Sequence, residues 1–246
     1  MGHCIIIGTG PGLGEAIARK FGHNGYLVSV VARNDVALAQ QTERLCAGGI
    51  SARYAVADAG NAAELANALE QVQEASGPCD VLVYNAAVLR SDGPLDVTPD
   101  LVRAEFDVNL VGALQSAQIV APHMIDQARG AILFTGGGLA FEPYPEWTSL
   151  ALGKAALRSL AFSLYKELAP KGVHVSVIAV CGIVESGGPF DPDAVVAEYY
   201  RLATAPRGVK DREVIIQPTG TDPHYNDPGR KHSATSLTPE HARHPP

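Results

Sequence analysis

Apolar runs of strand length alternate with helical patterns along most of the 246-residue chain. This alternation favours parallel strands joined by crossover helices, because two parallel neighbours need a long connection between them. We therefore expect a single α/β domain with one doubly wound parallel sheet. Its seven strands are expected at residues 4–7, 27–32, 52–57, 80–84, 131–135, 174–180 and 213–217. Its helices are expected near residues 12–22, 35–47, 61–75, 99–128, 148–169 and 192–203.

The ends of the predicted strands mark the place where a ligand is expected. Crossovers between parallel strands of one sheet are right-handed almost without exception, so the carboxyl ends of the strands share one edge. In open α/β sheets ligands bind outside this edge, where the strand order reverses. The residues that fall there are Gly8, Asp58, Asn85, Gly136 and Gly182.

The composition and charge of the chain limit the kinds of partner that it can bind. The formal net charge is −7 and no basic block offsets it, so a nucleic acid or an anionic membrane surface would be repelled. No segment approaches the roughly 20 apolar residues of a membrane span, and the first apolar run is too short for a signal region. We therefore expect a cytoplasmic protein with a small-molecule partner.

The last part of the chain differs from the rest. Residues 218–246 are rich in proline, histidine and small polar residues and show almost no apolar periodicity, so we expect a tail outside a domain at residues 1–217. The histidines of this tail have no spacing typical of a compact metal site, and we expect no metal. Reduced, packed thiols are expected at Cys4, Cys46, Cys79 and Cys181.

A glycine-rich loop follows the first predicted strand. Gly8, Gly12 and Gly14 form a GxxxGxG pattern that ends a buried strand and opens a helix. Such a loop lets the backbone approach a pyrophosphate, whose charge the helix N-terminus favours. The alternative is a tight strand-to-helix turn that only needs small residues.

Three further motifs favour the first interpretation. With the glycine loop, YNAA at residues 84–87, Asn109 in FDVNLVGALQSA and Lys154 in LALGKAALRSLAF, the chain resembles the short-chain dehydrogenase/reductase family over about residues 1–217. The resemblance implies a Rossmann-type domain that binds a nicotinamide dinucleotide. It also implies cofactor contacts at Gly8, Gly12, Leu13, Gly14, Asp58, Asn85, Ala86, Lys154, Ile183 and Ser186.

Arg33 indicates which cofactor binds. The second strand ends VVARND, with Ala32 at the position where the family reads NAD with an aspartate, and Arg33 next. A guanidinium suits bidentate contact with a 2′-phosphate, so NADP(H) is favoured over NAD(H). The alternative is a solvent-facing arginine beside Asp35.

The catalytic positions of the family are only partly filled. Lys154 and Asn109 match the lysine that grips the ribose and the asparagine of the proton path, but Leu150 or Trp147 stands where the tyrosine belongs. Gly136 and Gly137 replace the serine. Tyr144 is the leading substitute acid, although its PYP context could also fix it as packing. A substrate pocket is expected at Gly137, Trp147 and Phe190.

These observations predict an NADPH-linked reductase with an atypical active site. The expected substrate is a small or medium apolar carbonyl, imine or activated alkene. The alternative is a nicotinamide-binding sensor or scaffold without turnover, which the empty tyrosine and serine positions suggest. As in family tetramers, residues 99–128 and 148–169 are expected to assemble a homodimer or homotetramer.

Overall fold

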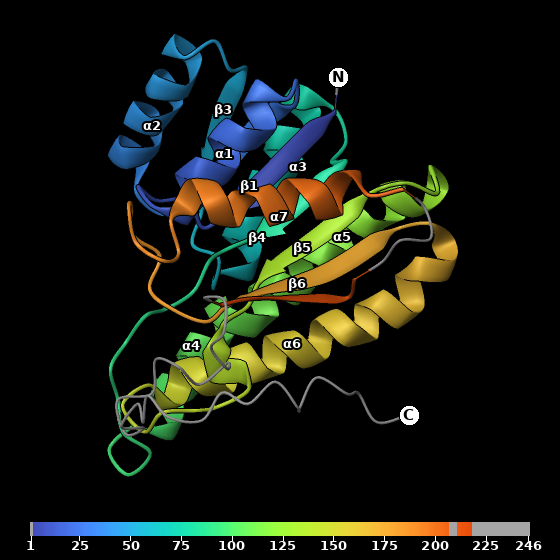
Figure 1. Ribbon diagram of the computed structural model, residues 1–246. Helices are drawn as coiled ribbons and strands as arrows, with labels where there is room; N and C mark the ends of the chain where they lie inside the picture. Colours follow the sequence, from blue (N-terminus) through green and yellow to red (C-terminus); the bar gives the residue numbers. More distant parts are fainter. Residues whose placement is uncertain (1, 207–210, 218–246) are drawn as a thin grey trace, which may run out of the picture.

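Seven parallel strands form one sheet in the order β3-β2-β1-β4-β5-β6-β7. The computed structural model describes residues 2–206 and 211–217, so the predicted tail lies outside the described residues (Figure 1). The strands are β1 (His3–Ile7), β2 (Leu27–Ala32), β3 (Ala52–Val56), β4 (Val81–Tyr84), β5 (Ala131–Thr135), β6 (His174–Val180) and β7 (Glu213–Ile216). The predicted α/β doubly wound sheet is confirmed, with strand ends that differ by one residue in places.

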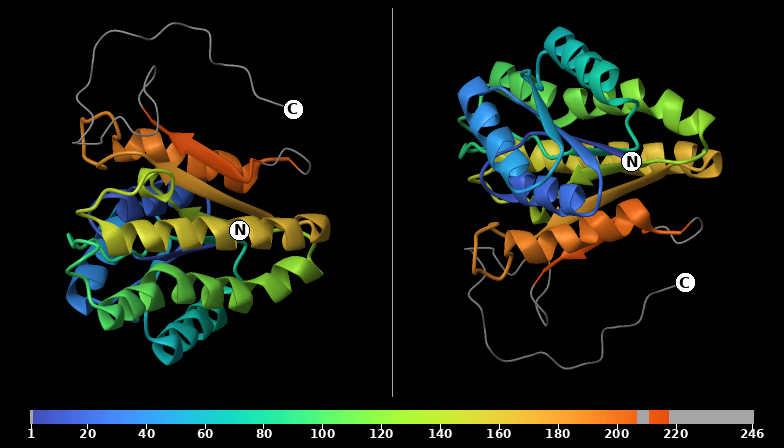
Figure 2. Two further views of the ribbon diagram at one scale, coloured as in Figure 1. Left: turned by 90° about the horizontal axis from the view of Figure 1, so that it is seen from below. Right: turned by 90° about the horizontal axis from the view of Figure 1, so that it is seen from above.

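Helices cover both faces of this sheet (Figures 1 and 2). The buried side chains of α1, α2 and α7 share one apolar cluster, and those of α3, α5 and α6 share the other. Their bounds are α1 (Leu13–His23), α2 (Asp35–Ala47), α3 (Ala62–Ser76), α4 (Pro99–Phe106), α5 (Gly112–Asp126), α6 (Thr148–Leu168) and α7 (Pro192–Thr204). The helix expected over residues 99–128 is divided by a π-helical turn, Asp107–Val111.

Local sequence signals place these elements. Helix α2 begins after Asn34, whose side chain accepts from Ala37 N at 3.0 Å, and Asn61 and Thr98 cap α3 and α4 in the same way. The strands read as continuous apolar runs because both faces of a covered parallel sheet are buried. All seven residues of β6 are buried, for example.

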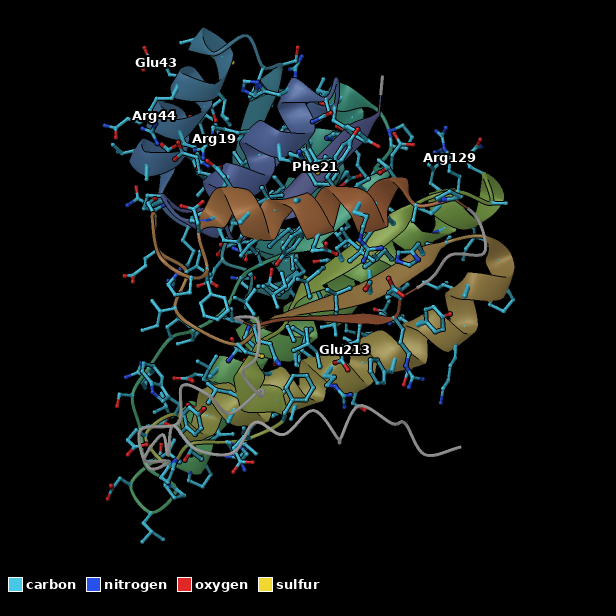
Figure 3. All side chains as sticks on the ribbon, viewed as in Figure 1. Arg19, Phe21, Glu43, Arg44, Arg129 and Glu213 are labelled. Carbon is cyan, nitrogen blue, oxygen red and sulfur yellow. The ribbon has the colours of Figure 1, made fainter. Side chains whose placement is uncertain are left out.

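The edge strand β7 is held by an ion pair as well as by its backbone. Arg158 on α6 donates from Nε and Nη2 to the two carboxylate oxygens of Glu213, at 2.5 and 2.8 Å. Glu213 is labelled in Figure 3. The guanidinium also lies 4.5 Å from the ring centre of Phe162. An arginine that donates two hydrogen bonds and stacks on a ring fixes the position of β7 against α6 better than a single charge contact would.

The switch point of the sheet lies between β1 and β4, which are neighbours although two strands separate them in sequence. The loops that follow these strands approach closely: a Cβ on Gly8 would lie 2.2 Å from Ala86 N, and Gly8 has a φ of +85°. Only glycine meets both demands without strain. The carboxyl edge at this point is therefore where the fold provides room for a ligand.

Two negative findings apply to residues 2–206 and 211–217. No helix there is long and apolar enough to cross a membrane. Nor does that part of the chain bring three or more histidine, cysteine or acidic side chains together as metal ligands.

Candidate active site

A cavity of about 1110 Å³ runs along the carboxyl edge of the sheet. It begins at the glycine loop, passes Lys154 and ends beneath residues 182–184. Its volume suits a dinucleotide together with a small substrate, since single-ligand pockets are usually 300–1,000 Å³. Predicted site residues that line it are Gly8, Gly12, Leu13, Gly14, Arg33, Asp58, Asn85, Ala86, Gly137, Tyr144, Trp147, Lys154 and Ile183.

The glycine loop has the form of a phosphate cradle. A Cβ on Gly10 or Gly12 would meet nothing within 4 Å, whereas one on Gly14 would lie 2.8 Å from Thr9 Cα. Gly14 is thus required for packing, and Gly10 and Gly12 leave open space in front of α1. No side chain caps the first turn of α1. Glu15 N donates to Gly10 O at 3.1 Å, so the amide groups of Leu13 and Gly14 and the positive end of the helix dipole are the part of this turn that fits a pyrophosphate.

Arg33 and Asp58 lie together at the adenosine end. Arg33 Nη1 is 3.8 Å from Asp58 Oδ2, and the Arg33 side chain is 74% exposed. An exposed ion pair at this distance contributes little to stability. The guanidinium can therefore leave Asp58 and bind a phosphate with little loss of free energy. Asp35, the neighbour considered from the sequence, is hydrogen-bonded to Tyr54 instead.

A hydrogen-bond network that the sequence did not reveal joins the two halves of the site. Asn85 Nδ2 donates to Gly8 O at 2.6 Å and Asn85 Oδ1 accepts from Thr135 Oγ1 at 2.8 Å. The same hydroxyl lies 2.8 Å from Tyr199 OH, and Lys154 Nζ donates to Thr135 O at 2.8 Å. Thr135 therefore links the glycine loop, α6 and α7. The available signal was its place at the end of the apolar run AILFT.

Lys154 is buried at the base of the cavity. Burial lowers the pKa of its ammonium group to about 8, because the charged form is disfavoured away from water. The positions around it contain no side-chain acid at the places that the family uses. Leu150, one helical turn earlier, is buried against the cavity, and a Cβ on Gly137 would lie 3.9 Å from Lys154 Cε.

Asn109 lies behind the cavity wall. Its Oδ1 accepts from Val88 N at 2.9 Å, and its Nδ2 has no hydrogen-bond partner among the described residues. Gly153 packs on it, since a Cβ there would lie 2.8 Å from Asn109 Cβ. The adjoining Val108 lines the cavity, and its carbonyl oxygen accepts from Tyr84 OH at 2.5 Å. Tyr84 thus braces the π-helical turn.

Two predicted site residues in the segment after β6, Ser186 and Phe190, do not line the cavity. Phe190 is 2% exposed and belongs to the apolar cluster of α7, so it does not line the pocket as expected. The reason is steric: Gly182 leaves a space that the Phe190 ring fills, and a Cβ there would lie 2.0 Å from it. Ser186 is exposed and is not among the lining residues, whereas Ile183 lines the cavity and is 78% exposed.

Behind Trp147 lies an acidic cluster, defined here as Asp92, Glu105 and Ser149. Ser149 N donates to Asp92 Oδ1 at 3.0 Å, Ser149 Oγ contacts the other oxygen of Asp92, and it lies 2.7 Å from Glu105 Oε2. Arg90 Nε donates to Glu105 Oε1 at 2.8 Å. The two carboxyl groups therefore share the Ser149 hydroxyl, and the guanidinium of Arg90 pairs with Glu105. The cluster connects the loop after β4 to the first turn of α6.

The fold and site together define a dinucleotide-binding α/β protein, and comparison with known proteins identifies its family. The model for short chain dehydrogenase matches residues 2–188. Oxidoreductase UcpA of Escherichia coli (strain K12) is 31% identical over 209 residues, which cover 79% of this chain and 77% of UcpA. The chain belongs to the short-chain dehydrogenase family, and at that level it is an NAD(P)-dependent oxidoreductase.

Solved structures support the same assignment. A metagenomic short-chain oxidoreductase in complex with NADP is 30% identical, with a TM-score of 0.81 over 89% of this chain and 97% of that one. A gluconate 5-dehydrogenase from Burkholderia cenocepacia J2315 in complex with NADP and tartrate is 25% identical, with a TM-score of 0.79 over 88% and 93%. The expected family and its Rossmann-type fold are confirmed.

Proposed function

We propose that the protein is an NADPH-dependent reductase of a small or medium apolar carbonyl, imine or activated alkene. The observation that carries the proposal is one continuous cavity that joins a glycine-loop phosphate cradle, Arg33 and the buried amine of Lys154. When bound, the cofactor would supply the hydride. Gly8, Gly12 and the first turn of α1 would hold its pyrophosphate, and Lys154 would hold its ribose.

NADPH is favoured over NADH because of Arg33. Among the described lining residues at the adenosine end, Arg33 is the one cation, and its weak pairing with Asp58 leaves it able to bind a 2′-phosphate. Two of the solved relatives were also described as NADP complexes. A second lobe of the cavity, beyond Lys154, is lined by Leu139, Trp147 and Leu150 and would accept an apolar substrate.

Calorimetric titration with NADPH and, separately, NADH tests the cofactor assignment. Arg33→Ala should weaken NADPH binding about 10- to 100-fold, since a charge-assisted contact contributes roughly 1.5–3 kcal/mol, and should leave NADH binding nearly unchanged. Arg53→Ala is the matched control, because Arg53 is exposed on the neighbouring β3 and does not line the cavity. Equal binding of both cofactors would refute the preference. Binding of neither would refute the reductase function.

Tyr144 is the candidate proton donor for carbonyl substrates. It lies in the segment between β5 and α6 and lines the same cavity as Gly137 and Leu150. Tyr144→Phe should lower ketone turnover about 10²- to 10⁴-fold, the usual effect of a general acid, while NADPH affinity stays constant. Steady-state kinetics beside calorimetry would separate the two effects. Unchanged ketone turnover would remove Tyr144 from this role.

A further inference from the structure

The substrate end of the cavity, defined here as Tyr144, Glu146, Trp147, Leu150 and Lys154, has a distinctive charge balance. Glu146 lines it at the exposed rim and forms no ion pair with any described residue. Lys154 is the one cation at this end among the described lining residues, and its Nζ is already bonded to Thr135 O.

The wall behind this end adds negative charge. The acidic cluster of Asp92, Glu105 and Ser149 adjoins Trp147, since Asp92 pairs with Trp147 in an isolated bridge and Ser149 lies in the first turn of α6. Glu105 is nearly fully buried and pairs with Arg90, which leaves Asp92 as the carboxyl group of the cluster with no cationic partner among the described residues. Charges in a poorly hydrated wall are screened less than exposed ones, so they act on a ligand in the cavity.

Aromatic side chains of this end also suit a cation. Trp147 and Tyr144 both line the cavity. The faces of tryptophan and tyrosine rings attract cations, by about 0.5–2 kcal/mol depending on exposure. The apolar remainder of the lobe, which includes Leu150, excludes a strongly hydrated ion and favours a cation that is attached to an apolar body.

The family's acid and oxygen holder are absent from their usual positions, and this absence also favours a cationic substrate. Hydride transfer to a neutral carbonyl leaves an alkoxide, which needs a proton, yet Leu150 and Gly137 occupy the places of the family's acid and oxygen holder. Reduction of an iminium ion needs no proton donor. The hydride adds to its carbon, the C=N π pair moves to nitrogen, and the product is a neutral amine while NADPH becomes NADP⁺. The atoms and charges balance without any proton transfer.

We propose that the substrate of this site is an iminium ion with an apolar body, for which Glu146 is the counter-ion and Trp147 the aromatic face. The proposal rests on the reductase function and selects one of its substrate classes. It assigns a specificity role to Glu146. It also accounts for an apolar Leu150 where the family has its acid.

The test compares two probes of similar size and different charge. N-methyl-3,4-dihydroisoquinolinium carries a permanent positive charge, whereas 1-tetralone is a neutral ketone. With NADPH at pH 7.5 and the protein-free rate subtracted, kcat/KM for the iminium should exceed that for the ketone at least ~100-fold, because only the ketone needs an acid. Calorimetry with NADPH alone is run on every sample.

Glu146→Gln should lower kcat/KM for the iminium roughly fivefold through KM, as expected for one exposed ion pair, and leave the NADPH affinity unchanged. Glu185→Gln is the control, since Glu185 is exposed in the segment after β6 and does not line the cavity. A ketone rate equal to or above the iminium rate would overturn the inference and leave the reductase function standing. An unchanged iminium KM in Glu146→Gln, or NADPH binding with no iminium turnover, would also overturn it. Absence of NADPH binding would overturn both proposals.

Discussion

Lys154 places an ammonium group where water hardly reaches, and this group donates a hydrogen bond to the carbonyl oxygen of Thr135. Burial lowers its pKa from 10.5 to about 8. Between these values the unfolded chain binds a proton that the folded chain does not, so stability rises as the pH increases through this window. Below about pH 8 the folded state carries the full desolvation penalty. A residue kept at such a penalty is typical of functional sites.

Lys154→Met should therefore stabilise the fold while it removes a ribose ligand. At pH 7 the free energy of unfolding is expected to rise by about 1–3 kcal/mol, which is the desolvation penalty less one hydrogen bond. The gain should shrink toward pH 10, where the folded wild type is already neutral at this position. Urea unfolding at both pH values measures it. Lys166→Met, an exposed position on the same helix, should show no such pH dependence. Destabilisation of Lys154→Met at both pH values would contradict the argument.

At the scale of the elements, the start of α6 depends on a distant segment. Trp147 occupies the N-cap and gives no side-chain cap, and Asp92 supplies the missing acceptor through its bond from Ser149 N at 3.0 Å. Backbone bonds reinforce the link, since Asp92 N donates to Glu146 O at 3.0 Å. The loop after β4 thereby sets the position of the residues that form the substrate end.

Asp92→Ala should weaken this link. Loss of an N-cap acceptor typically destabilises by about 0.5–2 kcal/mol, and relief of repulsion with Glu105 places the expected value near 1 kcal/mol. Asp96→Ala serves as the control, because Asp96 is exposed in the same loop and such surface changes usually stay within about 0.5 kcal/mol. Equal unfolding midpoints for the two variants in urea would show that Asp92 does not cap α6.

Sequence patterns predicted the strands well and the site unevenly. Buried parallel strands are continuous apolar runs, so their positions can be recognised within a residue or so. The π-helical turn at Asp107–Val111 was missed because one extra residue in a turn hardly alters an apolar pattern. The acidic cluster was missed for another reason. Ser149 meets Asp92 across 57 residues and Glu105 across 44, and no local pattern records such contacts.

At the scale of the whole molecule, the two halves of the sheet carry separate parts of the function. The half that begins with β1, α1 and β2 contains the glycine loop and Arg33, which form the proposed cofactor end of the cavity. The half that contains β5, α6 and β6 supplies the substrate end, where Leu150 and Gly137 replace the family's reactive side chains. The network through Asn85 and Thr135 joins the halves at the switch point.

This division explains why the fold tolerates the altered chemistry. Leu150 is buried, so an apolar side chain there adds to packing, and full burial of a leucine contributes about 1.5–3 kcal/mol. Gly137 lies in an extended conformation that any residue adopts, so the backbone does not require glycine there. The fold therefore does not require the family's tyrosine and serine at these positions. A site without the family's acid at position 150, with the proposed cofactor cradle beside it, is suited to a substrate that brings its own positive charge.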